Sequence, residues 1–193
     1  KISTPKEKPK KRVAPPVPVE SKYCSGAVMI FQYADAMWGA IISVGGDFYD
    51  KETYYRYLQT DIKMFSKPTM KDVLNAHIID PSFHSKEYNS FRDPIFYHYF
   101  VYLISGYLTN AGTKKFEKYN DSTFEIIGYL ADWGRCSSGI YNSFGYYKQK
   151  TAEKFKQCVI KELTKIYEEN PDVRTEMTVA EIEKEFVSRK DIG

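Results

Sequence analysis

Apolar residues recur at helical spacing along much of this 193-residue chain. The cleanest pattern covers Thr151 to Glu169, where apolar side chains return every three or four residues while lysines and glutamates fill the opposite side. A helix with one buried face has this period. The alternation of apolar and polar residues that is typical of a half-buried strand is not sustained for more than a few residues. The pattern therefore favours helices over sheets.

Helix start signals divide the chain further. Capping-box pairs open helices at Thr69, Ser122 and Thr178, and Asp93-Pro94 opens another because proline lacks the amide donor that a first turn leaves unused. Together with the periodicity, they predict helices over 24–44, 50–65, 70–79, 95–111, from 123, 151–169 and 179–190. We therefore expect an all-α fold, an irregular bundle of about six or seven helices.

The segment 26–46 raises the question of a membrane span. Asp35 is its one charged residue, and about 20 apolar residues are enough to cross a bilayer. Gln32, Asp35 and Gly39 lower its hydrophobicity, so a buried helix of a folded core is the preferred interpretation. A span would force Asp35 to find a partner inside the membrane.

Residues 1–22 differ in composition from the rest of the chain. They hold five of the nine prolines and carry seven basic residues against two acidic ones, a net charge of +5. Because the whole chain carries +3, the other 171 residues carry −2. Proline fixes φ and removes amide donors, so this segment favours an extended conformation. We expect two parts, an extended basic proline-rich arm (1–22) and a single helical domain (23–193).

The arm is the first candidate for partner binding. Arg12, Pro15 and Pro18 have the RxxPxxP spacing that places two prolines in an aromatic groove. A spacer or strap is the alternative interpretation of the same residues. The basic groups would also attract an anionic membrane surface, whereas nucleic-acid binding is not expected because the arm has no aromatic residue for base stacking.

Tyrosine is abundant, with 17 residues in the chain. It buries a ring while its hydroxyl seeks a partner, a combination that suits protein–protein contacts. Tyr54, Tyr55, Arg56 and Tyr57 fall on the expected helix 50–65, where four consecutive side chains cannot all face inward. We therefore expect this run to belong to a tyrosine-rich helical surface that binds a partner. A core that simply uses aromatic residues is the alternative.

The three cysteines, Cys24, Cys136 and Cys158, lack CxxC and paired Cys/His spacing, which disfavours a zinc site. A disulfide between Cys136 and Cys158 is the candidate pairing, since their separation suits two antiparallel helices joined by a short turn. Three reduced thiols are the alternative. A disulfide and the absence of an initiator methionine favour an exported or organellar protein, in the periplasm, outside the cell, or at the mitochondrial intermembrane space or inner membrane.

Catalytic signals are weak. The sequence contains no GxGxxG, GxxxxGK[ST] or GxSxG motif, and its three histidines lack metal-ligand spacing. Asp35 and His98 lie in apolar segments where burial would shift their pKa values, so they are the candidates for an acid/base pair of a hydrolase. Hydrogen-bonded core residues are the simpler interpretation. We expect no catalytic residue, metal, cofactor or small-molecule ligand.

These patterns favour a protein that binds other proteins. We expect a non-catalytic subunit or accessory protein of a larger membrane-associated or envelope assembly, docking onto other subunits through its arm and its tyrosine-rich helical surface. One alternative is a small periplasmic or secreted inhibitor or immunity-type binding protein. The other is the hydrolase that uses Asp35 and His98.

Overall fold

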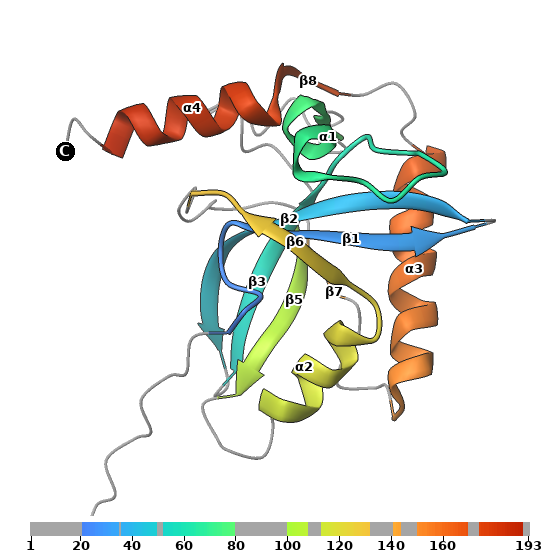
Figure 1. Cartoon of the computed structure of the whole chain (residues 1–193). Coiled ribbons are helices and arrows are strands. Elements are labelled where there is room, and N and C mark those ends of the chain that lie inside the picture. The colour runs from blue at the N-terminus through green and yellow to red at the C-terminus, as the bar shows by residue number, and fades with distance from the viewer. Residues whose placement is uncertain are drawn as a thin grey trace, which may run out of the picture.

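The structure is a computed structural model that describes residues 21–34, 36–49, 52–79, 100–107, 113–131, 141–143, 150–169 and 174–190. These residues form eight strands and four helices (Figure 1). The strands are β1 (Ala27–Tyr33), β2 (Met37–Tyr49), β3 (Glu52–Gln59), β4 (His77–Ile79), β5 (Phe100–Tyr107), β6 (Glu125–Tyr129), β7 (Tyr141–Ser143) and β8 (Arg174–Thr178). The helices are α1 (Met70–Asn75), α2 (Thr113–Asp121), α3 (Ala152–Glu169) and α4 (Val179–Lys190).

A six-stranded sheet forms the centre of the molecule, with the strand order β6-β1-β2-β3-β5-β7. Neighbouring strands are antiparallel except β5 and β7, which are parallel. β4 and β8 form a separate antiparallel pair. The prediction of an all-α bundle of six or seven helices is therefore wrong, because several of the expected helices are strands of a mixed α and β fold.

The segment predicted as a helix over 24–44 is a β-hairpin. β1 and β2 pair in antiparallel register along most of β1. Successive residues of a strand face opposite sides of the sheet, and here both sides are covered: Val28 and Ile30 lie in one core, Met29 and Phe31 in the other. A strand buried on both faces shows no polar alternation, so the helical spacing of its apolar residues is coincidental. Among the described residues, no helix is long and apolar enough to cross a membrane.

Three further helix predictions fall on strands. The ranges 50–65 and 95–111 contain β3 and β5, which are rich in tyrosine and β-branched residues that favour strands. The helix expected from 123 is replaced by β6, and Ser122, expected to cap that helix, instead follows the end of α2. The Ser122 and Thr123 hydroxyls donate hydrogen bonds to the Tyr119 carbonyl at 2.7 and 3.2 Å. These polar residues therefore end one helix rather than beginning another.

Three helices agree with their sequence signals. α3 covers the predicted segment 151–169 and buries its apolar side. The Thr69 hydroxyl accepts a hydrogen bond from the Asp72 backbone N–H at 3.4 Å, and the Thr178 hydroxyl accepts one from the Glu181 N–H at 3.3 Å. Each carboxylate in turn accepts from the backbone N–H of its threonine, which completes the predicted capping boxes of α1 and α4. α1 is shorter than predicted, because residues 77–79 form β4.

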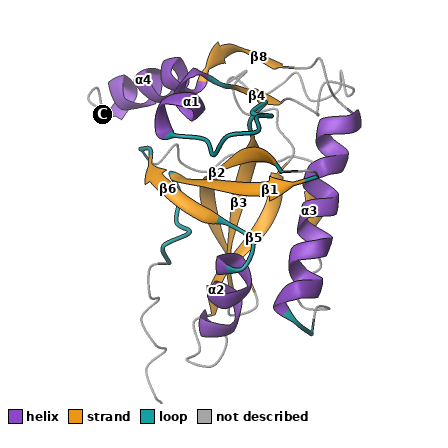
Figure 2. Cartoon of the chain, turned by 45° about the vertical axis from the view of Figure 1, so that its right-hand side comes forward, coloured by secondary structure: helices purple, strands orange, loops and turns teal. Residues whose placement is uncertain are grey.

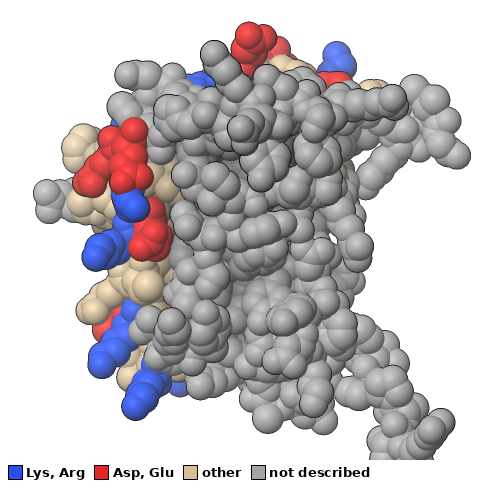
Figure 3. Space-filling model, turned by 180° about the vertical axis from the view of Figure 1, so that it is seen from behind, with Lys and Arg blue, Asp and Glu red and all other residues tan. Residues whose placement is uncertain are grey.

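Helices cover both faces of the central sheet (Figure 2). On one face, α3 and α2 close a core in which Phe155, Val159 and Leu163 pack with Phe31 and Tyr57. On the other face, α1, α4 and β4 close a second core. The charged residues of α3 lie along an exposed edge with both signs interspersed (Figure 3). That edge is therefore a solvated surface, and the candidate site lies elsewhere.

Candidate functional site

Many of the residues predicted to have a functional role lie outside the described residues. Arg12, Pro15 and Pro18 fall in 1–20, so partner binding by the arm stays a prediction, as does the division of the chain at residue 22. Asp35 and His98, the candidate acid/base pair, also fall outside the described ranges.

The tyrosine run lies on β3 and not on a helix. Tyr54, Tyr55 and Arg56 occupy positions between β2 and β5, which pair with β3 on its two sides. Tyr57 is 1% exposed and belongs to the core beneath α3. The prediction that this run lies on a helix is therefore wrong. Partner binding by the run stays a prediction.

The structure describes one of the two cysteines of the candidate disulfide. Cys158 is half-buried on α3, and Cys136 lies outside the described residues, so their pairing stays a prediction. Burial, with a smaller contribution from Glu162, raises the pKa of the Cys158 thiol. A raised pKa disfavours the thiolate, which is the nucleophilic form of cysteine.

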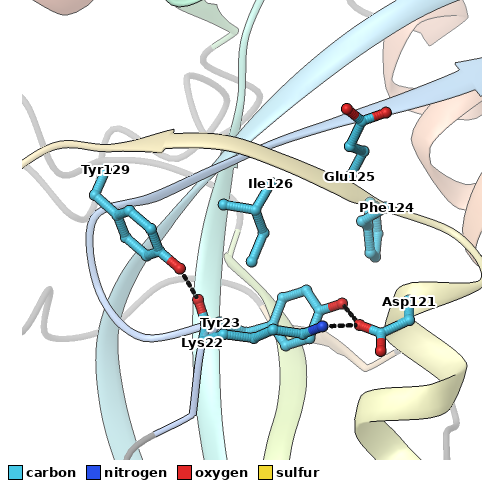
Figure 4. A pocket seen from close by; sticks show the side chains of 7 residues that line it. All are labelled: Lys22, Tyr23, Asp121, Phe124, Glu125, Ile126 and Tyr129. Atoms are coloured by element: carbon cyan, nitrogen blue, oxygen red, sulfur yellow. Dashed lines mark hydrogen bonds and ion pairs between the residues drawn. The ribbon is translucent and has the colours of Figure 1, made fainter.

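A pocket lies beside residues 22 and 23, which precede β1 (Figure 4). Its volume is about 610 Å³, and its lining consists of Lys22, Tyr23, Asp121, Phe124, Glu125, Ile126 and Tyr129. The first two residues precede β1, Asp121 ends α2, and the others lie just before or on β6. Three aromatic residues, two carboxylates and one ammonium group thus line one open pocket, with Tyr23 and Phe124 buried at its base.

The segment before β1 is tied to β2 and β6 beside this pocket. The Gly26 N–H donates to the Ser43 carbonyl at 2.7 Å, and the Ser43 hydroxyl donates to the Tyr23 carbonyl at 2.9 Å. From β6, the Tyr129 hydroxyl donates to the Lys22 carbonyl at 3.1 Å. These bonds hold the backbone of residues 22–26 against β2 and β6.

Asp121 is the electrostatic centre of the pocket. Its Oδ1 accepts hydrogen bonds from the Tyr23 hydroxyl and from the Lys22 ammonium group, the latter at 2.6 Å. The Lys22 Nζ also lies 5.4 Å from the centroid of the Tyr23 ring, within the range of a cation–π contact. The two side chains of the ion pair are 48% and 45% exposed, so the pair stabilises the fold by no more than about 1 kcal/mol.

Tyr23 connects the pocket to the core. Its side chain is 1% exposed and packs in the cluster beneath α3. Burial, and then the hydrogen bond to the Asp121 carboxylate, raise the pKa of the Tyr23 hydroxyl well above its usual value of 10.0. Tyr23 is therefore protonated at neutral pH and acts as a hydrogen-bond donor, not as a base.

Tyr23→Phe should lower the free energy of unfolding by about 1–3 kcal/mol, because it removes a part-buried hydrogen bond to a charged group. Folding raises the Tyr23 pKa, so this contribution is complete below pH 10.0 and is lost as the pH rises further. Urea unfolding at about pH 7 and about pH 11 should therefore show a smaller difference between wild type and variant at alkaline pH. Tyr129→Phe, which removes an exposed hydrogen bond, is the control. An undiminished difference for Tyr23→Phe in alkali would contradict the assignment.

The second carboxylate of the pocket is also paired. Glu125 Oε1 accepts from Lys67 Nζ at 2.6 Å, which ties the loop between β3 and α1 to the start of β6. Phe65 of that loop is 77% exposed, and Tyr129 at the far end of β6 is 55% exposed. β6 is an edge strand of the sheet formed by the described residues. The exposed Tyr129 therefore stands at the end of an edge strand, and the exposed Phe65 lies two residues before Lys67, which contacts Glu125 at the start of that strand.

The arrangement has the character of a binding site. Its carboxylates contact lysines, and its buried tyrosine is protonated. Within the ranges that the structure describes, no group of three or more His, Cys, Asp or Glu side chains is placed to hold a metal ion. An apolar and aromatic wall with charged groups at the rim is what a pocket needs to recognise a side chain of another molecule.

The sequence did not predict this pocket. Tyr23 and Asp121 are 98 residues apart, and no local motif joins them. They meet because β6 pairs with β1 and because α2, which the periodicity did not indicate, ends beside β6. At Lys22 the sequence shows a positive charge, which indicates a basic segment and not a pocket.

No family model, no curated protein and no solved structure matches the chain.

Proposed function

We propose that this protein is a non-catalytic subunit or accessory protein of a larger assembly, and that it docks through its N-terminal arm together with the adjacent pocket. The observation that carries the proposal is that Lys22, the last residue of the arm, lines the pocket, and that Tyr23 follows it in the same wall. A partner held by the arm is therefore brought next to the pocket. The charge of the arm also suits an assembly at an anionic membrane or envelope surface.

The anchoring of residues 22–23 supports this proposal. The hydrogen bonds from Ser43 and Tyr129 hold the backbone of residues 22–23 against β2 and β6. Two linked contacts bind more tightly than either alone when the linkage keeps them within reach of one partner. The exposed Tyr129 on β6 adds aromatic surface at the pocket, and aromatic side chains are enriched at protein interfaces.

Deletion of residues 1–20 tests the proposal. It removes nothing from the segment that is tied to β2 and β6, so we expect an unchanged circular-dichroism spectrum and urea midpoint. Co-purification of the partner from the native source should fall at least about tenfold, because the linked contact is lost. Lys165→Ala on the exposed edge of α3 is the control and should leave the yield unchanged. A complex recovered in full after the deletion would sink the proposal.

A further inference from the structure

We infer that the pocket receives an arginine side chain from the partner protein. The inference rests on the proposed function, since it names the group that the docking pocket recognises. It starts from the charge, the rings and the free volume of the lining.

The lining of the pocket favours a cation. Asp121 and Glu125 contribute two carboxylates against the single ammonium group of Lys22, so the lining carries a net charge of −1. Glu117, one turn before Asp121 on α2, also acts electrostatically on the Tyr23 hydroxyl. Lys67 reaches Glu125 from the loop before α1, through an ion pair whose two side chains are about half exposed. A positively charged side chain is therefore the complementary ligand.

Lys22 shows how a cation is bound in this place. Its ammonium group contacts the Asp121 carboxylate at 2.6 Å and lies over the Tyr23 ring at 5.4 Å, so it uses a carboxylate and an aromatic face together. Figure 4 shows the Lys22–Asp121 ion pair at one side of the pocket, with Phe124 and Ile126 across from it. The pocket of about 610 Å³ has room for a cation larger than the Lys22 ammonium group at the same carboxylate.

An arginine of a partner has the means to displace Lys22. An ion pair that is half exposed on both sides is weakly held. A guanidinium group donates two parallel N–H bonds to one carboxylate, so it can engage both oxygens of Asp121, whereas Lys22 contacts Oδ1. Its planar face also stacks on aromatic rings: Tyr129 is 55% exposed in the lining, and displacement of Lys22 uncovers the Tyr23 ring face over which that lysine lies. The displaced Lys22 ammonium group returns to water.

A ¹H–¹⁵N NMR titration of the full chain with N-acetyl-arginine amide tests the inference. The neutral isostere N-acetyl-citrulline amide is the matched control ligand. We expect saturable shifts confined to residues 21–23 and 121–129, with the citrulline compound at least about tenfold weaker because it cannot form the charged bidentate contact. Equal binding of the two compounds, or shifts spread evenly over the carboxylates of α3, would overturn the inference.

Variants locate the contact. Asp121→Asn should weaken arginine binding at least about fivefold, and the unchanged spectrum of the remaining residues reports that the variant is folded. Glu168→Gln, an exposed carboxylate on α3, should leave binding unchanged. Lys22→Gln should tighten binding, since it removes the internal competitor. No effect of Asp121→Asn, or weaker binding by Lys22→Gln, would overturn the inference.

The outcome separates the two proposals. Arginine binding at the pocket together with a complex that survives deletion of residues 1–20 would support the inference and reject the docking role of the arm. Loss of the complex on deletion, with no arginine binding at the pocket, would support the docking role of the arm and reject the inference. Arginine binding that emerges only after the deletion would show that the arm of this chain fills the pocket, and would overturn the assignment to a partner.

Discussion

Gly26→Ala is expected to lower the free energy of unfolding by about 3–5 kcal/mol, which is enough to unfold a marginally stable domain. Gly26 has a φ of +91°, a conformation that residues with a side chain rarely adopt. A Cβ at this position would lie 2.3 Å from the Leu130 carbonyl oxygen. The Leu130 N–H donates to the Gly26 carbonyl at 2.8 Å, so the two backbones cannot separate without losing this bond.

Gly128→Ala is the matched control for this prediction. A Cβ on Gly128 would lie 2.6 Å from Met70 Sδ, but this contact is with a flexible side chain that can turn away. We expect a cost of about 1 kcal/mol or less, in line with a modest overpacking. Urea unfolding followed by circular dichroism measures both variants. Equal losses of unfolding free energy for Gly26→Ala and Gly128→Ala would contradict the close backbone approach at Gly26. That approach also sets the position of Lys22 and Tyr23 at the pocket.

The second large effect is expected for Phe31→Ala, at about 3–5 kcal/mol. The Phe31 ring is fully buried beneath α3 and contacts the Phe124 ring edge to face, with centroids 6.2 Å apart. It also stacks on the Tyr167 ring at 6.4 Å. Its removal therefore leaves a cavity between the sheet and α3, which the surrounding rings cannot fill without leaving their own contacts.

Ile30→Ala and Gln32→Ala complete this test. Ile30 is fully buried in the other core, so its truncation should cost about 2–5 kcal/mol. Gln32 is exposed and should change the free energy of unfolding by no more than about 0.5 kcal/mol. Two large losses at adjacent positions, followed by a negligible one, are the pattern of a strand covered on both faces. A harmless Ile30→Ala would contradict that burial.

The predictable elements of the fold are those whose signals are local. α3 has one buried and one solvated side, so its period is visible in the sequence. The Thr69–Asp72 and Thr178–Glu181 pairs act within a single turn, and the first turns of α1 and α4 follow from them. β1 could not be recognised in this way, because Val28 to Phe31 are apolar toward both cores and no alternation survives.

The pocket could not be predicted because it depends on long-range pairing. Tyr23 reaches Asp121 only after β6 has joined β1 and α2 has ended at its side. Of the tyrosine run on β3, Tyr57 is buried in the core beneath α3, whereas the tyrosine exposed at the pocket, Tyr129, lies on β6 and outside that run. What the sequence did indicate is the basic segment that ends at Lys22, where the pocket begins.

Site-specific photo-crosslinking tests the central claim most directly. A benzophenone amino acid replaces Tyr129 at the rim of the pocket, or Gln157 on the exposed side of α3 as the control, in the full chain produced in its native source. We predict one discrete cross-linked product with a partner protein from position 129, none from position 157, and loss of the product when residues 1–20 are deleted. Equal products from both positions, or a product at 129 that persists without the arm, would contradict docking through the arm and the pocket.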